Sequence, residues 1–465
     1  VRLRAVTAEG AGTASVSVSG STLPAAPSSP IASPIVGQSI KVSVAFTAPS
    51  GTITGYQFSI DGGTNWTDNA TFTGSGPYIV TASPALTTDT TYAIRAIATD
   101  LAGNTSTANL STTNARITVD TTDPASGTLT MTTSDPGADG IVGTLTPAFS
   151  LATASDTAYT GTNAPTAAVA SVAIQVSSDG GTTWTTKGTS ASSSAPYTAT
   201  LAGLTSGTTY SIRALVTDTA GNTVTSALST TSGKITVDTT APTVGTLTMT
   251  TTDDGSSSSD GIIGTLTPAF SLASASDTSY TGTGAATAGI ASVVLQVSTN
   301  GSTWTDNATF TAPTGSDTAY TVTASPALST NTTYKIQARV TDTAGNSATT
   351  DLSTTSATIV VDTTNPTAGT LAIVETDGVT NDGVVKVTTP AFTVTSPADT
   401  GYGAAAIWKV QLQVASGASG GSFTDSGTAA TSLTSGAYAL TLGAQTPDGT
   451  YRVQAVTYDV AGNTS

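Results

Sequence analysis

Two short acidic motifs recur along the chain and supply the residues best suited to chemistry. The motif Val-Asp-Thr-Thr-x-Pro places aspartates at Asp120, Asp238 and Asp362. The motif Asp-x-Ala-Gly-Asn occurs at 100–104, 218–222, 342–346 and 459–463. Carboxylate, amide and carbonyl oxygens are the ligands that Ca²⁺ prefers, and it takes about 6–8 of them. These residue types therefore indicate a cation site wherever the fold brings the two motifs together.

The composition excludes most other chemistry. The 465 residues include no Cys and no His, so disulfides, thiolate metal sites and the commonest general base are excluded. Thirteen Lys and Arg against 29 Asp and Glu give a formal net charge of −16. This charge disfavours nucleic acid and anionic membranes as partners and favours cations. Without a phosphate loop, a nucleophile elbow or a long apolar run, we expect neither an enzyme nor direct membrane insertion of this segment.

The chain is a tandem array, because the motifs recur and the segments 143–151 and 264–272 are identical. The predicted domains are 23–120, 121–238, 239–362 and 363–465, the last without its final strand. Residues 1–22 match the F–G hairpin of a preceding, truncated domain. We expect either a window cut from a longer array or strand exchange, in which the N-terminal strand of one chain completes the fourth domain of the next. The redundant strand at 1–7 favours the window.

Each repeat predicts about seven short strands rather than helices. In the third repeat the Val-, Ile-, Thr- and Tyr-rich runs fall at 245–251, 265–272, 293–298, 303–310, 320–324, 334–341 and 357–362. Turn residues separate them, and no segment has helical periodicity. The pattern indicates an all-β sandwich or barrel.

The motifs resemble those of two related domain families. Leu-x5-Tyr at Tyr92, Tyr210 and Tyr334 resembles the E–F corner of fibronectin type III domains. The linker, the Asp-x-Ala-Gly-Asn loop and the stretch 253–261 resemble bacterial Ig-like repeats of adhesins, biofilm and surface-layer proteins. The resemblance implies an elongated tandem array of Ig-like, fibronectin type III-like Greek-key β-sandwiches. It is weaker in the first repeat, whose lead-in 23–30 lacks the linker aspartate, and the Leu-x5-Tyr spacing is lost before Tyr451.

In such a sandwich the incoming linker, the B–C loop and the F–G loop lie at one pole. The predicted metal ligands are therefore Asp120, Asp156, Asp218 and Asn222; Asp238, Asp277, Asp342 and Asn346; and Asp362, Asp399, Asp459 and Asn463. The A–B loops at the opposite pole add weaker candidates, namely Asp135, Asp139, Asp253, Asp254, Asp260, Asp377 and Asp382. Bound Ca²⁺ would relieve carboxylate repulsion and lock the interdomain angle. The alternative is that these Asp and Asn residues only form turns by bonding their own backbone.

Other features bear on function. Trp66, Trp184 and Trp304 follow Gly-containing turns, which indicates hairpins with packed Trp rather than sugar-binding platforms. We expect a structural extracellular segment of a bacterial cell-surface protein, as a stalk, surface lattice or filament component. The alternative is an adhesin module that itself binds a glycan or a protein. Expected partners are copies of the chain or other surface components, with glycans and host or neighbouring-cell proteins as further candidates. The joint before 23–30 is expected to be the soft one.

Overall fold

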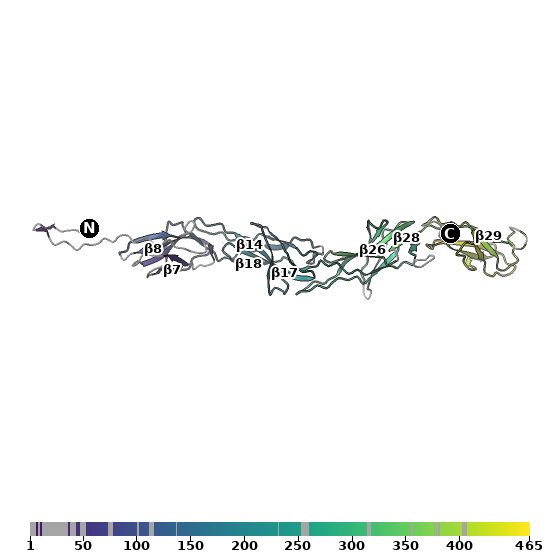
Figure 1. Cartoon of the computed structure of the whole chain (residues 1–465), viewed down its shortest axis with the longest axis horizontal. Helices are drawn as coiled ribbons and strands as arrows, with labels where there is room; N and C mark the ends of the chain where they lie inside the picture. Colours follow the sequence, from purple (N-terminus) through teal and green to yellow (C-terminus); the bar gives the residue numbers. More distant parts are fainter. Residues whose placement is uncertain are drawn as a thin grey trace. The chain divides into compact units, whose positions relative to one another are not determined.

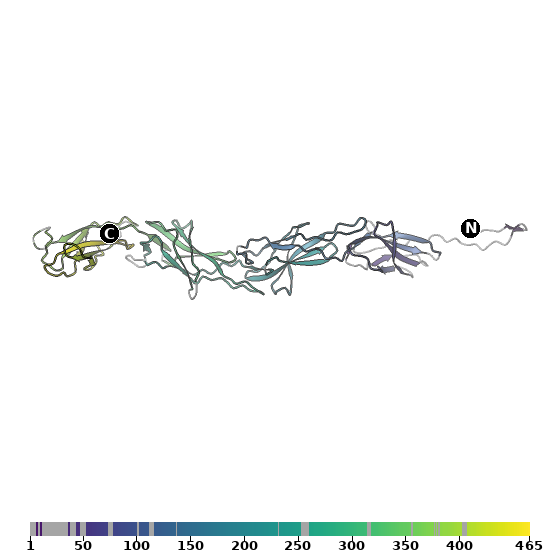
Figure 2. The ribbon, with the colours of Figure 1, turned by 180° about the vertical axis from the view of Figure 1, so that it is seen from behind.

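The structure is a computed structural model in which strands are joined by loops (Figure 1, and Figure 2 from behind). It describes residues 6–7, 10–11, 36–37, 43–46, 53–72, 78–99, 102–110, 116–135, 137–230, 232–252, 260–313, 318–354, 357–375, 377, 379, 382–401 and 407–465. The chain divides into two compact units. Unit 1 comprises Val1–Asp135, Thr144–Val237 and Thr281–Ala285, and unit 2 comprises Pro136–Gly143, Asp238–Tyr280 and Ala286–Ser465.

Within the described residues, the N-terminal part and the first repeat supply ten strands to unit 1. These are β1 (Val6–Thr7), β2 (Gly10–Ala11), β3 (Val36–Gly37), β4 (Ser43–Phe46), β5 (Ile53–Ser59), β6 (Thr67–Phe72), β7 (Tyr78–Thr81), β8 (Thr90–Thr99), β9 (Thr105–Asn109) and β10 (Arg116–Val119). The two-residue strands β1 and β2 pair antiparallel, and most of the hairpin expected over 1–22 lies outside the described residues.

The second repeat supplies nine strands. These are β11 (Thr128–Met131), β12 (Ile141–Val142), β13 (Ala148–Ala152), β14 (Val169–Ser177), β15 (Thr185–Thr189), β16 (Tyr197–Thr200), β17 (Thr208–Asp218), β18 (Thr223–Ala227) and β19 (Lys234–Val237). All but β12 belong to unit 1.

The third and fourth repeats form the rest of unit 2. The third has β20 (Thr246–Met249), β21 (Ile262–Ile263), β22 (Ala269–Ala273), β23 (Ile290–Ser298), β24 (Thr305–Thr309), β25 (Ala319–Thr323), β26 (Thr332–Asp342), β27 (Ser347–Asp351) and β28 (Thr358–Val361). The fourth has β29 (Thr370–Val374), β30 (Ala391–Thr395), β31 (Ile407–Ser416), β32 (Thr424–Asp425), β33 (Ala437–Thr441) and β34 (Tyr451–Asp459).

The third repeat shows how its own sandwich is built, and the second repeat has the same strand order. One sheet has the order β20-β22-β25, and the other has the order β21-β28-β26-β23-β24, with β27 paired to the second half of β26. The predicted all-β fold of Ig-like sandwiches is confirmed. Two strands were not predicted. Strand β21 has two residues and runs parallel to β28, and β27 alternates only between exposed and half-buried positions. Neither has the length or burial that makes a strand visible in a sequence.

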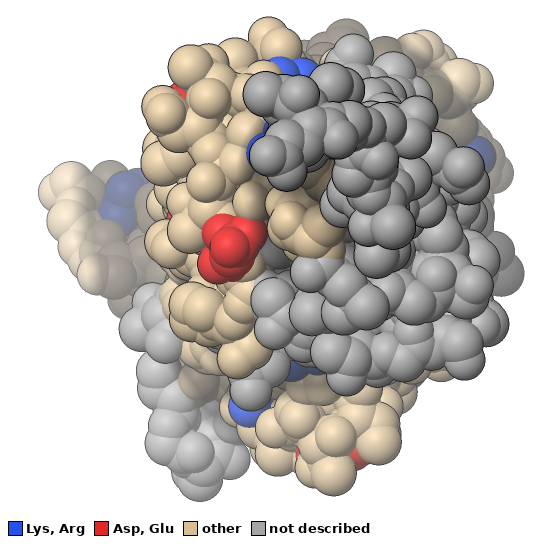
Figure 3. All heavy atoms as spheres, turned by 90° about the vertical axis from the view of Figure 1, so that its left-hand side faces the viewer, with Lys and Arg blue, Asp and Glu red and all other residues tan. Residues whose placement is uncertain are grey.

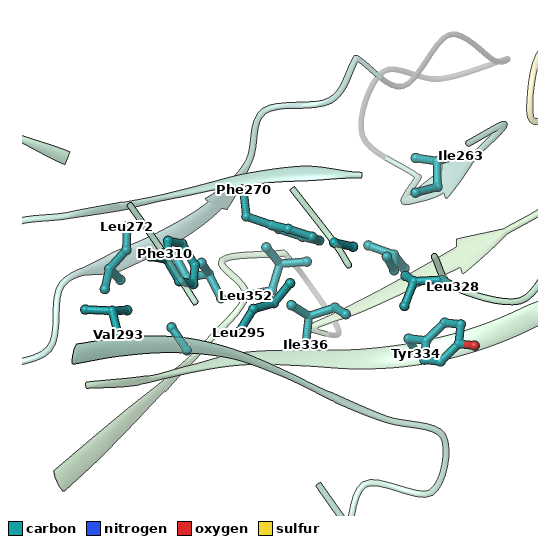
Figure 4. Packing of buried hydrophobic residues seen from close by; sticks show 14 of the residues in the cluster. Ile263, Phe270, Leu272, Val293, Leu295, Phe310, Leu328, Tyr334, Ile336 and Leu352 are labelled. Atoms are coloured by element: carbon teal, nitrogen blue, oxygen red, sulfur yellow. The ribbon is translucent and has the colours of Figure 1, made fainter. Parts of the chain in front are cut away.

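The core of the third repeat lies between these two sheets (Figure 4). Strand β22 has the sequence Ala-Phe-Ser-Leu-Ala, so alternation sends Phe270 and Leu272 inward, where they pack with Val293 and Leu295 of β23 and Ile336 of β26. Full burial of such side chains contributes about 1.5–3 kcal/mol each. The repeats contain no Cys, so this packing and the strand pairing have to hold each sandwich together.

A tyrosine at the start of the long F strand, which is β8, β17, β26 or β34 in the four repeats, anchors the preceding turn. The hydroxyl oxygen of Tyr334 accepts a hydrogen bond from the backbone N–H of Ser329 at 3.0 Å. Tyr92 and Tyr210 do the same to residues five positions upstream, at 2.9 and 3.1 Å. In the fourth repeat Tyr451 accepts from the N–H of Thr446 at 3.0 Å and also contacts its carbonyl oxygen at 3.1 Å. The corner is therefore kept there although the Leu-x5-Tyr spacing is lost.

Removing this hydroxyl should loosen the third repeat. We expect Tyr334→Phe to lower the free energy of local opening by ~1 kcal/mol, because the Ser329 N–H loses its acceptor. Amide hydrogen exchange around 329–336 should become about fivefold faster. Tyr320→Phe is the control, since Tyr320 packs against the same core without a corner bond. Equal effects of the two changes would contradict the role of the corner.

Candidate metal centres

The predicted aspartates meet in three clusters, each at the ends of two strands. Within each cluster, one carboxylate oxygen per residue lies within 4.8 Å of the others: Asp120, Asp156 and Asp218; Asp238, Asp277 and Asp342; Asp362, Asp399 and Asp459. The linker aspartates directly follow β10, β19 and β28, whose last three residues are all buried. Because these strands end inside the sandwich, the linker carboxylates are 0%, 2% and 0% exposed.

The third aspartate of each cluster ends the F strand (Asp218, Asp342 or Asp459) and organises its own turn. Asp218 Oδ1 accepts the backbone N–H groups of Ala220, Gly221 and Asn222 at 2.8, 2.7 and 2.9 Å. Gly221 has φ +96°, a left-handed conformation that favours glycine. The turn-forming interpretation of Asp-x-Ala-Gly-Asn is therefore correct as far as Oδ1 is concerned. It does not exclude a cation, because the same side chain also stands in a carboxylate cluster.

The asparagines of the motif tie this turn to the linker backbone. Asn222 Nδ2 donates to Asp218 Oδ2 at 2.8 Å and to the carbonyl oxygen of Asp120 at 3.3 Å. Asn346 and Asn463 make the matching bonds to the carbonyls of Asp238 and Asp362 at 3.0 and 2.9 Å. These asparagines, which the sequence suggests as ligands, thus have a positioning role that the sequence does not reveal.

Asn463 also faces the preceding repeat within unit 2. A Cβ atom at Gly264 would lie 3.3 Å from Asn463 Oδ1 and 2.8 Å from the carbonyl oxygen of Ala461. Only a glycine lets the backbone after β21 approach the F–G loop of the fourth repeat so closely. Gly143 approaches Ala344 and Asn346 in the same way.

Sequence reasoning missed two tyrosines that belong to the clusters. The Tyr159 hydroxyl donates to Asp120 Oδ2 at 3.0 Å and lies 3.5 Å from Asp156 Oδ2 and 3.1 Å from Thr219 Oγ1. Tyr280 repeats this arrangement with Asp238 at 3.0 Å and Asp277 at 3.4 Å. The available signal was the shared string Asp-Thr-x-Tyr at 156–159 and 277–280. Tyr402 stands at the same place in the sequence and lies outside the described residues.

The environment disfavours charge on several of these carboxyl groups. Burial, reinforced by the neighbouring aspartates, raises the pKa of Asp120 and of Asp156 above its ordinary value. The same causes raise the pKa of Asp277 and of Asp459. At an effective dielectric constant of about 20, two like charges 4.8 Å apart repel by roughly 3–4 kcal/mol. A bound cation would remove this repulsion and keep the carboxylates ionised.

The third cluster gives the strongest sign that a cation fits. All three of its aspartates are buried, and Asp399 is 7% exposed. Its Oδ1 accepts the N–H of Gly401 at 2.9 Å, whereas its buried Oδ2 has no hydrogen-bond partner among the described residues. A buried acceptor left unpaired costs about 1–3 kcal/mol. Gly401 is also required sterically, because a Cβ there would overlap the carboxylate of Asp362. The donor set is all oxygen, which suits a hard divalent cation.

The A–B loops look different. The described carboxylates there accept the backbone N–H two residues ahead, as Asp139, Asp260 and Asp382 do from Ile141, Ile262 and Val384 at 2.9, 3.0 and 2.9 Å. Among the described residues these loops hold no cluster of three acidic groups. Asp253 and Asp254 lie outside the described residues.

Charged side chains are sparse on one described face of the molecule. On the face drawn in Figure 3 most described atoms belong to uncharged residues, in keeping with a charged fraction of 9%. A helix able to cross a membrane is not found in the part of the chain that the structure describes.

Comparisons with known proteins agree with the predicted domain type. Residues 241–363 match the family model described as a bacterial Ig-like domain. This segment is the third repeat, so the predicted resemblance to bacterial Ig-like repeats is confirmed. No curated protein matches.

The chain also aligns with solved structures of three proteins. The FN1–FN3 domains of chicken CNTN1 share 13% identity, covering 73% of this chain and 95% of that one, with a TM-score of 0.26. Titin domains A168–A170 share 11%, covering 74% and 94%, with a TM-score of 0.27. A 1.5-MDa bacterial ice-binding adhesin, described in the context of host cell surface retention, shares 17%, covering 74% and 99%, with a TM-score of 0.24.

The raised pKa values predict that the protein, kept metal-free by a chelator, becomes more stable as the pH falls. A carboxyl with a folded pKa above 3.8 binds its proton more tightly in the folded chain. Thermal stability of the metal-free protein should therefore rise as pH falls from neutral through these raised values towards 3.8. The pKa values of Asp61 and Asp179 are lowered, so their contribution is lost only below that window.

The variant Asp120→Asn should weaken this pH dependence, because it removes one of the crowded charges. Asp425→Asn, at an exposed position, is the control and should leave the dependence unchanged. Melting temperatures recorded by calorimetry at each pH would test this. A stability that falls steadily on acidification above pH 3.8 would contradict the electrostatic account.

The close approach of Gly264 to the F–G loop of the fourth repeat can be tested by adding a side chain at this position. Gly264→Ala should force the F–G loop of the fourth repeat away and destabilise its local structure by about 1–3 kcal/mol. Amide exchange over 459–463 should speed up. Gly289→Ala is the matched control, because the nearest atom to its new Cβ is 4.0 Å away. Unchanged amide exchange over 459–463 in Gly264→Ala would show that this contact does not stabilise the loop.

Proposed function

We propose that this chain is a structural repeat segment of a bacterial cell-surface protein, a stalk, lattice or filament component, stiffened by Ca²⁺ at its repeat junctions. The observation that carries the proposal is the burial of three aspartates at the same pole of three successive repeats. The match of residues 241–363 to a bacterial Ig-like domain supports an extracellular, cell-surface location and a non-catalytic module.

A cation at the junction would stiffen it through a loop that also contacts the preceding repeat. In unit 1 the loop that carries Asp156 also pairs with the first repeat, since Thr160 N–H donates to Asp89 O and Thr160 O accepts Thr91 N–H, both at 2.8 Å. Thr281 makes the matching bonds to Gly207 and Thr209 at 2.8 and 2.9 Å. A cation held between the linker and this loop would fix the loop against the preceding repeat, and thereby fix the joint.

The ligand chemistry favours calcium. Transition-metal and zinc ions prefer imidazole or thiolate ligands, and this sequence contains no His and no Cys. Mg²⁺ demands near-ideal octahedral geometry and gives up water reluctantly, whereas Ca²⁺ accepts irregular sets of carboxylate and carbonyl oxygens. Extracellular calcium modules bind with Kd on the order of 10⁻⁴–10⁻³ M, which is the range we expect here. The lead-in 23–30, expected to form a soft joint, lies outside the described residues.

Calcium titration tests this directly. We expect calorimetry to detect three sites, and Asp277→Asn to lose one of them, because its carboxylate belongs to the second cluster. Calcium at ten to a hundred times Kd should stabilise each occupied junction by ~1–3 kcal/mol. Asp351→Asn is the control, since Asp351 is exposed at the end of β27 in the same repeat.

Small-angle scattering then separates binding from stiffening. With Ca²⁺ the chain should lose flexibility, and chelator should restore it, with an intermediate result for Asp277→Asn. Binding without any change in scattering would refute the stiffening role, and the absence of binding would refute the calcium site itself.

A further inference from the structure

A turn in the third repeat differs from its counterparts in the first two. Between β23 and β24 the chain contains Asn300-Gly301, the only Asn-Gly dipeptide in the sequence. The corresponding turns begin with Asp61-Gly62 and Asp179-Gly180. Asn300 is exposed and Gly301 has φ +70°. Asn-Gly is the dipeptide in which the next backbone nitrogen meets least steric hindrance in attacking the side-chain amide, because glycine has no Cβ.

The turn polarises the Asn300 amide carbonyl. Asn300 Oδ1 accepts the backbone N–H groups of Ser302 and Thr303, both at 2.8 Å. Two N–H donors aimed at one atom also identify that atom as the oxygen. A pair of backbone amides in this position stabilises negative charge that develops on a carbonyl oxygen under nucleophilic attack.

A buried serine hydroxyl links the attacking and the attacked groups. Ser298 is 3% exposed. Its Oγ accepts the Gly301 N–H at 2.9 Å and donates to Asn300 Oδ1 at 3.1 Å. One hydroxyl can thus take the proton from the Gly301 nitrogen while it gives its own to Oδ1, which is general acid–base assistance in a single relay.

We propose that this turn is a built site of self-deamidation that converts Asn300 to aspartate. The Gly301 nitrogen bonds to Asn300 Cγ and its proton passes through Ser298 Oγ to Oδ1. The tetrahedral intermediate then breaks the Cγ–Nδ2 bond, releases ammonia and leaves a succinimide. Water adds to Cγ, the Cγ–N bond of the ring breaks, and aspartate forms. The balance is asparagine plus water to aspartic acid plus ammonia, with no oxidant or cofactor.

The first two repeats show that the turn accepts the product. Asp179 Oδ1 accepts from Ser177 Oγ at 2.6 Å and from the N–H groups of Thr182 and Thr183 at 3.0 Å. Asp61 has the same kind of donors in Ser59, Thr64 and Asn65. These hydrogen bonds, the serine hydroxyl first, hold the pKa of Asp61 and of Asp179 well below the usual range. The turn therefore favours negative charge on the oxygen where the intermediate develops it.

Peptide mapping by mass spectrometry of the full chain, incubated at neutral pH, tests the proposal. We expect amide-to-acid conversion at Asn300 to be first order and faster in the native chain than in the same chain unfolded in urea. Ser298→Ala should slow it in the native state by ~10²-fold and leave the unfolded rate unchanged, because the relay exists only in the fold. Gly301→Ala should slow it in both states.

The matched control is Ser177→Ala, which removes the same hydroxyl from the second repeat, where Asp179 already stands. Amide exchange over the hairpin of this variant measures how far loss of the hydroxyl disturbs the local structure. Conversion of Asn300 in the same variant should stay at the wild-type rate. The proposal is overturned if native chain converts no faster than unfolded chain, or if Ser298→Ala with an intact hairpin converts as fast as wild type.

Discussion

Burial of the linker aspartate is the constraint on which each acidic cluster depends. Asp120, Asp238 and Asp362 directly follow strands whose last three residues are buried, so their carboxylates cannot turn to solvent without unravelling the strand end. Each stands beside two more aspartates. The structure offsets part of the resulting cost with backbone N–H donors and, in two clusters, a tyrosine hydroxyl. The part of this cost that the hydrogen bonds do not offset favours the binding of a proton or a cation at this pole.

The F strand links this pole to the rest of the sandwich. Strand β8 begins beside the tyrosine corner at Tyr92, and its Thr91 bonds the loop that carries Asp156 in the second repeat. Strand β17 begins at the corner of Tyr210 and ends at Asp218 in the first cluster. Strand β17 also bonds the loop of the following repeat near its start, where the Thr209 N–H donates to the carbonyl oxygen of Thr281, so this one strand has a backbone contact to the next repeat at its start and a carboxylate at its end.

Near-identical repeats allow comparisons in which only one group differs. The turn between β23 and β24 holds Asn300 in the third repeat, whereas the corresponding turns of the first two repeats hold an aspartate. The serine hydroxyl and the backbone donors are retained. The three acidic poles also differ, since Asp399 keeps an oxygen without a partner among the described residues whereas Asp156 and Asp277 each have a tyrosine hydroxyl within 3.5 Å. Repetition of the fold thus does not imply repetition of the chemistry.

The sequence by itself determined the features that depend on local patterns. Alternation of apolar residues predicted the strands that bury Phe270 and Leu272, and the Tyr spacing predicted the corners at Tyr92, Tyr210 and Tyr334. The grouping of nine aspartates into three sets also followed, because strand order in a sandwich places the linker, B–C and F–G loops at one pole.

Only the tertiary structure decided how those groups contact one another. The role of Tyr159, the turn of Asn222 towards a linker carbonyl and the unpaired oxygen of Asp399 depend on distances across loops from separate parts of the chain. Loop conformation sets such distances to within an ångström, and residue types alone do not encode it at that precision. The relay proposed at Ser298 has the same origin, since its two partners, the Gly301 N–H and Asn300 Oδ1, converge only when the turn is folded.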